Sequence, residues 1–324
     1  MNDERWARVL THSNEFTCYS AALATWLAAA DDDWGSVVNP GLWLRITEAQ
    51  DGLFGFGYFP PALRARLGLL RTGTDDAAEA IAGVRAEIER SGRVIVAGDG
   101  YRLPWHVASG RQHVPHWFVL TQSDNGLEFA DPFACRNELG VQVAARGAAM
   151  EESLPELLMA LPAGEPVHRL REMLALGDEI PEPGPERYRW FVGDDVEAPI
   201  EPVGYDGPDA VVRLARHFRE RGQDPQAYSQ ADDIWSIARH RAFLWRYAEA
   251  RAQARGNADL KAWVDEHAAP LAKRWGHVAP LLMQATLALS AGRTASASVP
   301  ETLERLAEQE QIAAETLPRR SITI

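Results

Sequence analysis

Apolar and polar positions along the chain follow different spacings in three consecutive stretches. In the first stretch, helical spacing with suitable capping residues and end charges predicts helices at 18–30 and 75–90. Runs of β-branched and aromatic residues predict strands at 93–97, 117–121 and 127–130. The Asn125-Gly126 dipeptide between the last two strands is typical of a tight hairpin turn.

Residues 176–207 interrupt these patterns with repeated prolines and glycines, and only 188–192 has the character of a strand. Beyond them, apolar residues recur every three or four positions, which is the spacing of amphipathic helices. The expected helices are 210–221, 234–255, 258–276, 278–291 and 300–316. We therefore predict an α+β domain at 1–175, a Pro-rich connector at 176–207 and a helical domain at 208–324.

The composition excludes several classes of function. The chain has 324 residues, of which 46 are Asp or Glu and 33 are Lys or Arg, so its net charge is −13. Such a surface repels phosphate backbones, and we expect no nucleic-acid partner. The polar N-terminus and the lack of a long apolar run predict a cytoplasmic protein without a membrane segment. The two cysteines exclude a disulfide framework, the dispersed histidines give little support for a metal site, and the oligomeric state stays open.

Cys18 is the first candidate for chemistry. An unpaired cysteine is most often a small buried apolar residue, and we interpret Cys135 in that way. Cys18 differs because it stands at the predicted start of a helix, where unpaired N–H groups and the positive end of the dipole favour a thiolate. The adjacent backbone N–H also points where an oxyanion would form on a thioester carbonyl.

A thiolate nucleophile needs a base, and His116 opens the apolar strand that leads into the predicted hairpin. Asp131 follows 15 residues later, enough for one strand out, a turn and one strand back. Antiparallel pairing would therefore return Asp131 beside His116, where a carboxylate can orient an imidazole and stabilise its cation. His113 is the rival base, but it precedes the strand, and Pro115 restricts the backbone between them.

Five short blocks of the chain occur in a shared order with a known family. They are Cys18-Tyr19-Ser20-Ala21-Ala22-Leu23, Gly55-Phe56-Gly57-Tyr58, Tyr101-Arg102-Leu103-Pro104-Trp105, His116-Trp117-Phe118-Val119-Leu120 and Ala130-Asp131-Pro132. With residues 238–247 and Trp275-Gly276 in the helical half, they make the chain resemble the butirosin-biosynthesis H-like family. That family is similar to the bacteriocin-processing, papain-like cysteine peptidases.

The resemblance implies a papain-like fold and an acyltransferase of specialised metabolism, with Cys18 as nucleophile, His116 as base and Asp131 as orienting acid. The acyl group would come from an acyl or peptidyl carrier protein as a phosphopantetheine thioester, and no cofactor would be bound. The acceptor would be a small-molecule amine or hydroxyl. Family members usually have His before the cysteine and Glu after it, where this chain has Thr17 and Tyr19.

Papain-like enzymes carry a glutamine oxyanion donor six residues before the cysteine, and here that position is His12. We therefore take His12 and Asn14 as candidate oxyanion donors. The aromatic segment 54–58 lacks the Lys and Ser/Thr of a phosphate-binding loop, so we interpret it as a tight turn near the cleft. The substrate-cleft candidates are Tyr19, Phe56, Tyr58, Tyr101, Trp105 and His113.

Other functions stay open at this point. The same triad suits a thioesterase, a cyclase or a cysteine peptidase, and a non-catalytic binding scaffold would keep only the fold. Basic residues between 239 and 255 form either a solvated helix face or a docking surface for an acidic carrier domain.

Overall fold

The structure is a computed structural model that describes residues 2–31, 33–39, 41–49, 52–59, 67–124, 126–161, 166–175, 186–193 and 205–317. The chain divides into two compact units, each built from two separate segments. Unit 1 comprises Met1–Val38 and Pro61–Ile200, and unit 2 comprises Asn39–Pro60 and Glu201–Ile324.

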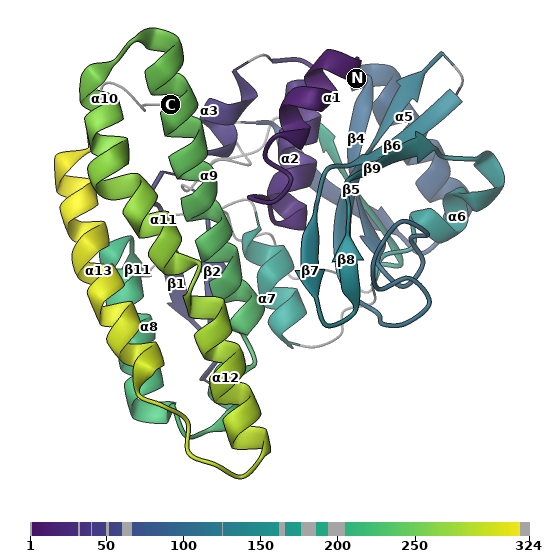
Figure 1. Ribbon diagram of the computed structural model, residues 1–324. Helices are drawn as coiled ribbons and strands as arrows, with labels where there is room; N and C mark the ends of the chain where they lie inside the picture. Colours follow the sequence, from purple (N-terminus) through teal and green to yellow (C-terminus); the bar gives the residue numbers. More distant parts are fainter. Residues whose placement is uncertain are drawn as a thin grey trace. The chain divides into compact units, whose positions relative to one another are not determined.

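Unit 1 is built on a six-stranded antiparallel sheet with strand order β3-β10-β4-β5-β6-β9 (Figure 1). Its strands are β3 (Leu69–Thr74), β4 (Arg93–Asp99), β5 (Pro115–Ser123), β6 (Gly126–Asp131), β9 (Ala145–Ala148) and β10 (Tyr188–Gly193). A separate hairpin consists of β7 (Cys135–Asn137) and β8 (Gly140–Gln142). The helices are α1 (Asp3–Leu10), α2 (Cys18–Ala28), α3 (Trp34–Val38), α5 (Ala77–Ser91), α6 (Leu154–Leu157) and α7 (Pro166–Leu174), with a 3₁₀ turn at Glu151–Ser153.

Alternating side chains of β4 and β5 pack into two separate hydrophobic layers, one on each face of the sheet. Val96 and Phe118 face the layer to which α5 contributes Val84 and Ile88. On the other face, Trp117 receives the ring of Tyr19 from α2, with ring centroids 4.6 Å apart and an edge-on angle of 86°. The two helices therefore cover opposite faces of the sheet, because neighbouring strand residues point to opposite sides.

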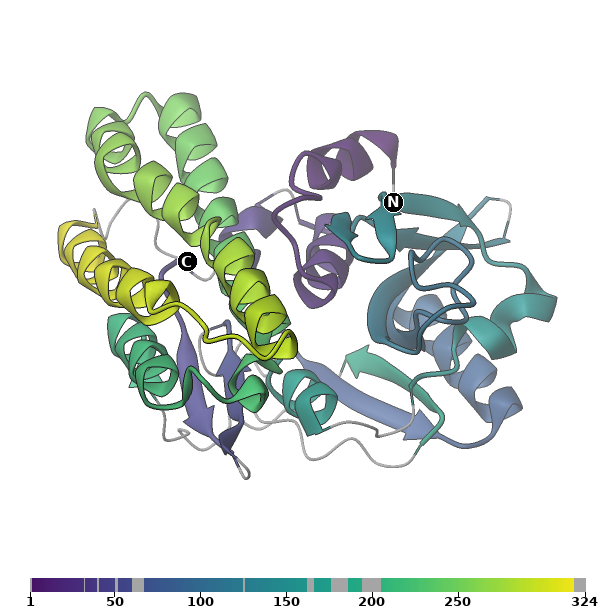
Figure 2. The same ribbon diagram turned by 60° about the horizontal axis from the view of Figure 1, so that its bottom comes forward.

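Unit 2 combines a small sheet of order β11-β1-β2 with a helical bundle. The strands are β1 (Arg45–Glu48), β2 (Phe54–Gly57) and β11 (Tyr205–Asp206). The helices are α8 (Pro208–Arg221), α9 (Ala231–Arg255), α10 (Ala258–Trp263), α11 (Ala269–Trp275), α12 (Val278–Ser290) and α13 (Ser298–Thr316), with a 3₁₀ turn at Pro225–Tyr228 and a π-helical turn at Val264–Ala268. Helices α8 and α13 lie side by side in both views (Figure 1, Figure 2).

A fully buried ion pair holds unit 2 together. Arg241 of α9 donates through Nε to Glu310 Oε1 of α13 at 2.6 Å and through Nη2 to Oε2 at 3.0 Å. Trp275 of α11 donates to the same carboxylate at 2.8 Å. The remaining guanidinium donors bond backbone carbonyls in the segment 41–43. This network explains why the segment before β1 belongs with the helices.

The structure confirms the α+β mixture and corrects the expected boundaries. The segment 39–60 belongs to unit 2, so 1–175 is not one continuous domain. The predicted connector 176–207 contains β10, which lies between β3 and β4 in the sheet of unit 1. Asn125 of the predicted turn and most of the connector prolines lie outside the described residues.

Two local expectations also change. Residues 54–57 form strand β2 rather than a turn, paired along its whole length with β1. The expected helix 258–276 is divided by the π-helical turn, which ends just before Pro270 in the first turn of α11. Proline lacks an N–H and its ring crowds the preceding turn, so a regular α-helix cannot pass through this point unchanged. Among the described residues, no helix combines the length and the apolar character needed to cross a membrane.

Candidate catalytic site

Cys18 is the first residue of α2, as the sequence predicts. Thr17 caps the helix: its Oγ1 accepts the Ser20 N–H at 3.2 Å, and Ser20 Oγ accepts the Thr17 N–H at 2.8 Å. This reciprocal capping box fixes the first turn of the helix. Cys18 itself stays partly exposed, so its thiol is both positioned and reachable.

His116 and Asp131 come together through the β5–β6 hairpin. Val119 pairs with Ala130, so the register places Asp131 opposite Phe118. His116 lies two residues before Phe118 on β5. Such diagonal neighbours lie on the same face of a sheet. His116 Nε2 is 2.8 Å from Asp131 Oδ2, and both side chains are 1% exposed. The contact expected from the hairpin is therefore present.

The imidazole also interacts with Cys18. A side-chain hydrogen bond and a charge interaction with Cys18 both contribute to raising the pKa of His116. Cys18, His116 and Asp131 thus form a continuous chain of contacts, with the imidazole between a thiol and a carboxylate.

The Asp131 carboxylate is saturated with donors. Besides His116, Oδ2 accepts the Trp105 indole N–H at 2.9 Å and the Gln142 amide at 3.4 Å, while Oδ1 accepts the Phe133 backbone N–H at 3.1 Å. Trp105 stacks on Phe129 at 3.7 Å between ring centroids. A buried carboxylate with this many donors is held in one orientation.

The electrostatics favour a charged imidazole. Burial by itself lowers the pKa of His116, but the charge and hydrogen bond of Asp131, supported by Cys18, outweigh it and raise that pKa to about 10. At neutral pH the ring is therefore an imidazolium beside a sulfur, and it can donate a proton to a group that reacts there.

A second histidine adjoins the first and behaves in the opposite way. The ring centroid of His106 lies 4.5 Å from that of His116. Burial and the charge of His116 lower the pKa of His106 to about 3. Its Nδ1 accepts the Ala108 N–H at 3.1 Å, so the neutral ring carries its proton on Nε2. No sequence pattern points to His106, because a histidine inside a loop has no periodic context.

The oxyanion donors are only partly defined. Among the described residues, no acceptor takes the Cys18 backbone N–H, which leaves it available to an oxyanion next to the sulfur. The ring centroid of His12 lies 6.1 Å from the ring centroids of both Phe16 and Trp34. Its Nδ1 is 3.7 Å from Glu15 Oε2. Asn14 is exposed. The roles of His12 and Asn14 stay predictions.

The remaining cleft candidates of unit 1 have other contacts. Tyr19 belongs to α2, and its buried ring packs against Trp117 of β5. Tyr101 stacks on His113 with ring centroids 4.3 Å apart, and both side chains are substantially exposed. His113 Nδ1 is 2.5 Å from the buried carboxylate of Asp99, so the rival base contacts a different acid.

Phe56 and Tyr58 belong to unit 2, where both rings are buried. The Tyr58 hydroxyl donates to the Asp233 carbonyl at 2.9 Å, and its ring stacks on His240 at 5.1 Å. These contacts are those of core residues, which corrects their assignment to an open cleft.

The basic face expected between residues 239 and 255 is also smaller than the sequence suggests. Arg239, His240 and Arg241 are all buried, so they cannot dock a partner. Arg246 is exposed but lies 3.7 Å from Glu249. The charge pattern alone concealed that one side of α9 points into the core.

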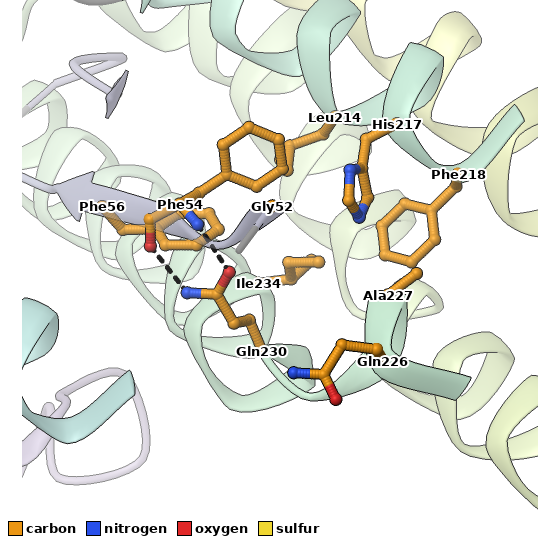
Figure 3. Close-up of a pocket in the computed structure, with 10 residues that line it drawn as sticks. All are labelled: Gly52, Phe54, Phe56, Leu214, His217, Phe218, Gln226, Ala227, Gln230 and Ile234. Atoms are coloured by element: carbon orange, nitrogen blue, oxygen red, sulfur yellow. Dashed lines mark hydrogen bonds between the residues drawn. The ribbon is translucent and has the colours of Figure 1, made fainter. Parts of the chain in front are cut away.

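A small pocket in unit 2 lacks the volume to hold a ligand (Figure 3). It offers only about 10 Å³ between Phe54, His217 and Phe218, roughly the space of one water molecule. The Gln230 amide closes one side by bonding the Phe54 backbone N–H at 2.8 Å and carbonyl at 2.6 Å. The described residues also contain no cluster of His, Cys, Asp and Glu arranged to bind a metal ion.

Sequence reasoning missed two further residues of the site, His106 and Gln142.

No protein-family model matches the chain, and no curated protein matches it either.

Proposed function

We propose that the protein is a papain-like, cysteine-dependent acyltransferase. The observation that carries this proposal is the buried His116–Asp131 pair beside the partly exposed Cys18, with Cys18 at a helix N-terminus and the pKa of His116 raised to about 10. A carrier-protein thioester would supply the acyl or aminoacyl group, and an amine or hydroxyl would accept it, as the family resemblance implies.

The chemistry follows from the arrangement in two balanced steps. The Cys18 thiolate attacks the thioester carbonyl, the carbon–sulfur bond to the carrier breaks, and the departing thiolate takes the proton from the His116 imidazolium. The acceptor then attacks the Cys18 thioester, gives its proton to His116 and releases the Cys18 thiolate. The Cys18 N–H supports the oxyanion in both steps.

A purely structural role explains this arrangement less well. A buried imidazolium–carboxylate pair costs desolvation energy that apolar residues would avoid. The thiol beside it adds no packing that alanine or valine could not supply. Keeping a partly exposed sulfur against a buried charged imidazole is therefore more consistent with catalysis than with a binding scaffold.

Intact-protein mass spectrometry with acyl N-acetylcysteamine thioesters tests the proposal. We expect a mass increase of one acyl group on the wild type and on Cys135→Ala, and none on Cys18→Ala. Amines should discharge the acyl-enzyme faster than water does. Faster discharge by water would indicate a thioesterase, and acylation of Cys135 alone would refute the site.

A further inference from the structure

Gln142 occupies a position that the triad itself does not require. It is the last residue of β8, it is 2% exposed, and it belongs to the separate β7–β8 hairpin rather than to the main sheet. Its Oε1 accepts the Val107 N–H at 2.9 Å, and its Nε2 donates to Asp131 Oδ2 at 3.4 Å. Because a backbone N–H can only donate, the orientation of the amide is fixed, with its NH₂ group toward the carboxylate.

Val107 lies in the loop 100–114, which covers the acid end of the triad. The neighbouring Trp105 donates to Asp131, and His106 lies against His116. The hairpin holds this loop a second time, because Arg111 Nη1 donates to the Leu139 carbonyl at 2.7 Å. One amide therefore connects the triad acid to the loop that covers it.

We infer that Gln142 is a positioning residue, which keeps the Asp131 carboxylate aligned with His116 and makes that alignment depend on the seated 100–114 loop. The inference rests on the proposed function, since it assigns Gln142 a part in activating Cys18. Without the amide, the carboxylate loses one of its donors and the half-buried Val107 N–H loses its acceptor, so both the acid and the loop gain freedom.

Two substitutions separate positioning from simple packing. Gln142→Met removes both hydrogen bonds while nearly keeping the volume. Gln142→Glu keeps both bonds when the introduced carboxyl group is protonated, since it then accepts from Val107 and donates to Asp131. Once ionised, it repels Asp131 instead. The ionisable groups around it are Asp131 and, beyond that carboxylate, His116 and His106.

The readout is the alkylation rate of Cys18 by iodoacetamide, followed by peptide mass spectrometry between pH 5 and 9. This reaction needs the activated thiol but no acyl donor. Cys135 in the same sample is the internal reference. Gln122→Glu, the same chemical change at an exposed position of β5, is the matched control. Thermal unfolding of each variant reports whether it is folded.

We expect Gln142→Met to slow Cys18 alkylation about tenfold between pH 5 and 8, where thiolate formation depends on the aligned imidazolium. Gln142→Glu should react at nearly the wild-type rate at pH 5 and fall toward the Gln142→Met rate by pH 8. Gln122→Glu should match the wild type throughout. If Gln142→Met does not fold, the pH-dependent loss in Gln142→Glu alone still tests the inference.

A constant ratio of Gln142→Glu to wild type at all pH values would overturn the inference and leave the proposed function standing. A wild-type Cys18 no more reactive than Cys135 would instead overturn the proposed function, and the inference with it.

Discussion

An almost completely buried ion pair occurs in unit 1 and another in unit 2, and the two pairs have different roles. His116–Asp131 and Arg241–Glu310 are both at most 1% exposed. A guanidinium cannot lose its proton in a protein, and the donors of Arg241 bond the carboxylate and three backbone carbonyls. An imidazolium can lose its proton, and it faces a thiol. The chemistry of the cation, rather than its burial, makes one pair a candidate for catalysis and the other a structural link.

Two buried histidines extend the comparison. His116 and His240 are 1% and 2% exposed, yet their pKa values move in opposite directions. Burial lowers the pKa in both, but Asp131 reverses the effect at His116, to about 10. At His240 the neighbouring charges of Arg241 and Arg239 add to the effect of burial and lower the pKa to about 3. A buried histidine is therefore informative about function only when its charged neighbours are known.

The largest expected effect is the loss of the base. His116→Ala should slow acylation of Cys18 by N-acetylcysteamine thioesters by about 10³-fold, within the range for a positioned acid–base group. His240→Ala, the matched control in unit 2, should lower stability but leave acylation per folded molecule unchanged. Single-turnover mass spectrometry measures both. Equal losses in the two variants would mean that the two histidines do not differ in role.

Breaking the other ion pair should change stability and not chemistry. Glu310→Gln leaves the buried Arg241 without a counter-charge, which costs about 3–5 kcal/mol. Urea unfolding measures this loss, and acylation per folded molecule should stay at the wild-type value. Glu304→Gln, which removes the exposed partner of Arg219, should cost less than about 1 kcal/mol. Similar losses for both variants would show that burial does not set the strength of these pairs.

Neutralising the triad acid should have an intermediate effect. Asp131→Asn still accepts a hydrogen bond from His116 but removes the charge that holds the imidazolium, so acylation should slow by about 10²-fold, the lower end of the range for an acid–base group and less than on loss of the base. The pKa of His116 should fall, because only the interaction with Cys18 then opposes the effect of burial. The alkaline limb of the pH–rate profile should therefore move to lower pH. An unchanged alkaline limb would show that a group other than His116 loses its proton there.

The contrast also explains what the sequence could and could not predict. The hairpin around Gly126 brings Asp131 to His116 by local pairing, so chain distance alone was enough to expect the contact. The start of α2 at Cys18 follows from its Thr17 cap. Both features depend on neighbours close in sequence, where period, turn and cap signals are strong.

Other features depend on distant partners and left no local signal. Strand β2 contains two glycines, which weaken strand propensity, and it forms because β1 pairs with it. The burial of Arg241 needs Glu310, 69 residues later in the chain. Gln142 and His106 join the site only after the loop 100–114 and the β7–β8 hairpin are in place.

The smallest effect concerns the pH dependence of stability in unit 2. Because the pKa of His240 is about 3 when folded and near 6.5 when unfolded, the unfolded chain binds its proton first as pH falls. The histidine therefore costs nothing above pH 6.5 and destabilises the fold progressively between pH 6.5 and 3.

His240→Phe keeps an aromatic ring on Tyr58 and removes this proton uptake. The free energy of unfolding of this variant, relative to wild type, should therefore be about 1–3 kcal/mol higher at pH 4.5 than at pH 7.5. Urea unfolding at the two pH values measures the difference. His116 should act in the opposite sense, because its raised pKa stabilises the fold below pH 6.5 and that contribution is lost as pH rises toward 10. A His240→Phe variant with the wild-type pH dependence would show that the buried ring does not control acid stability.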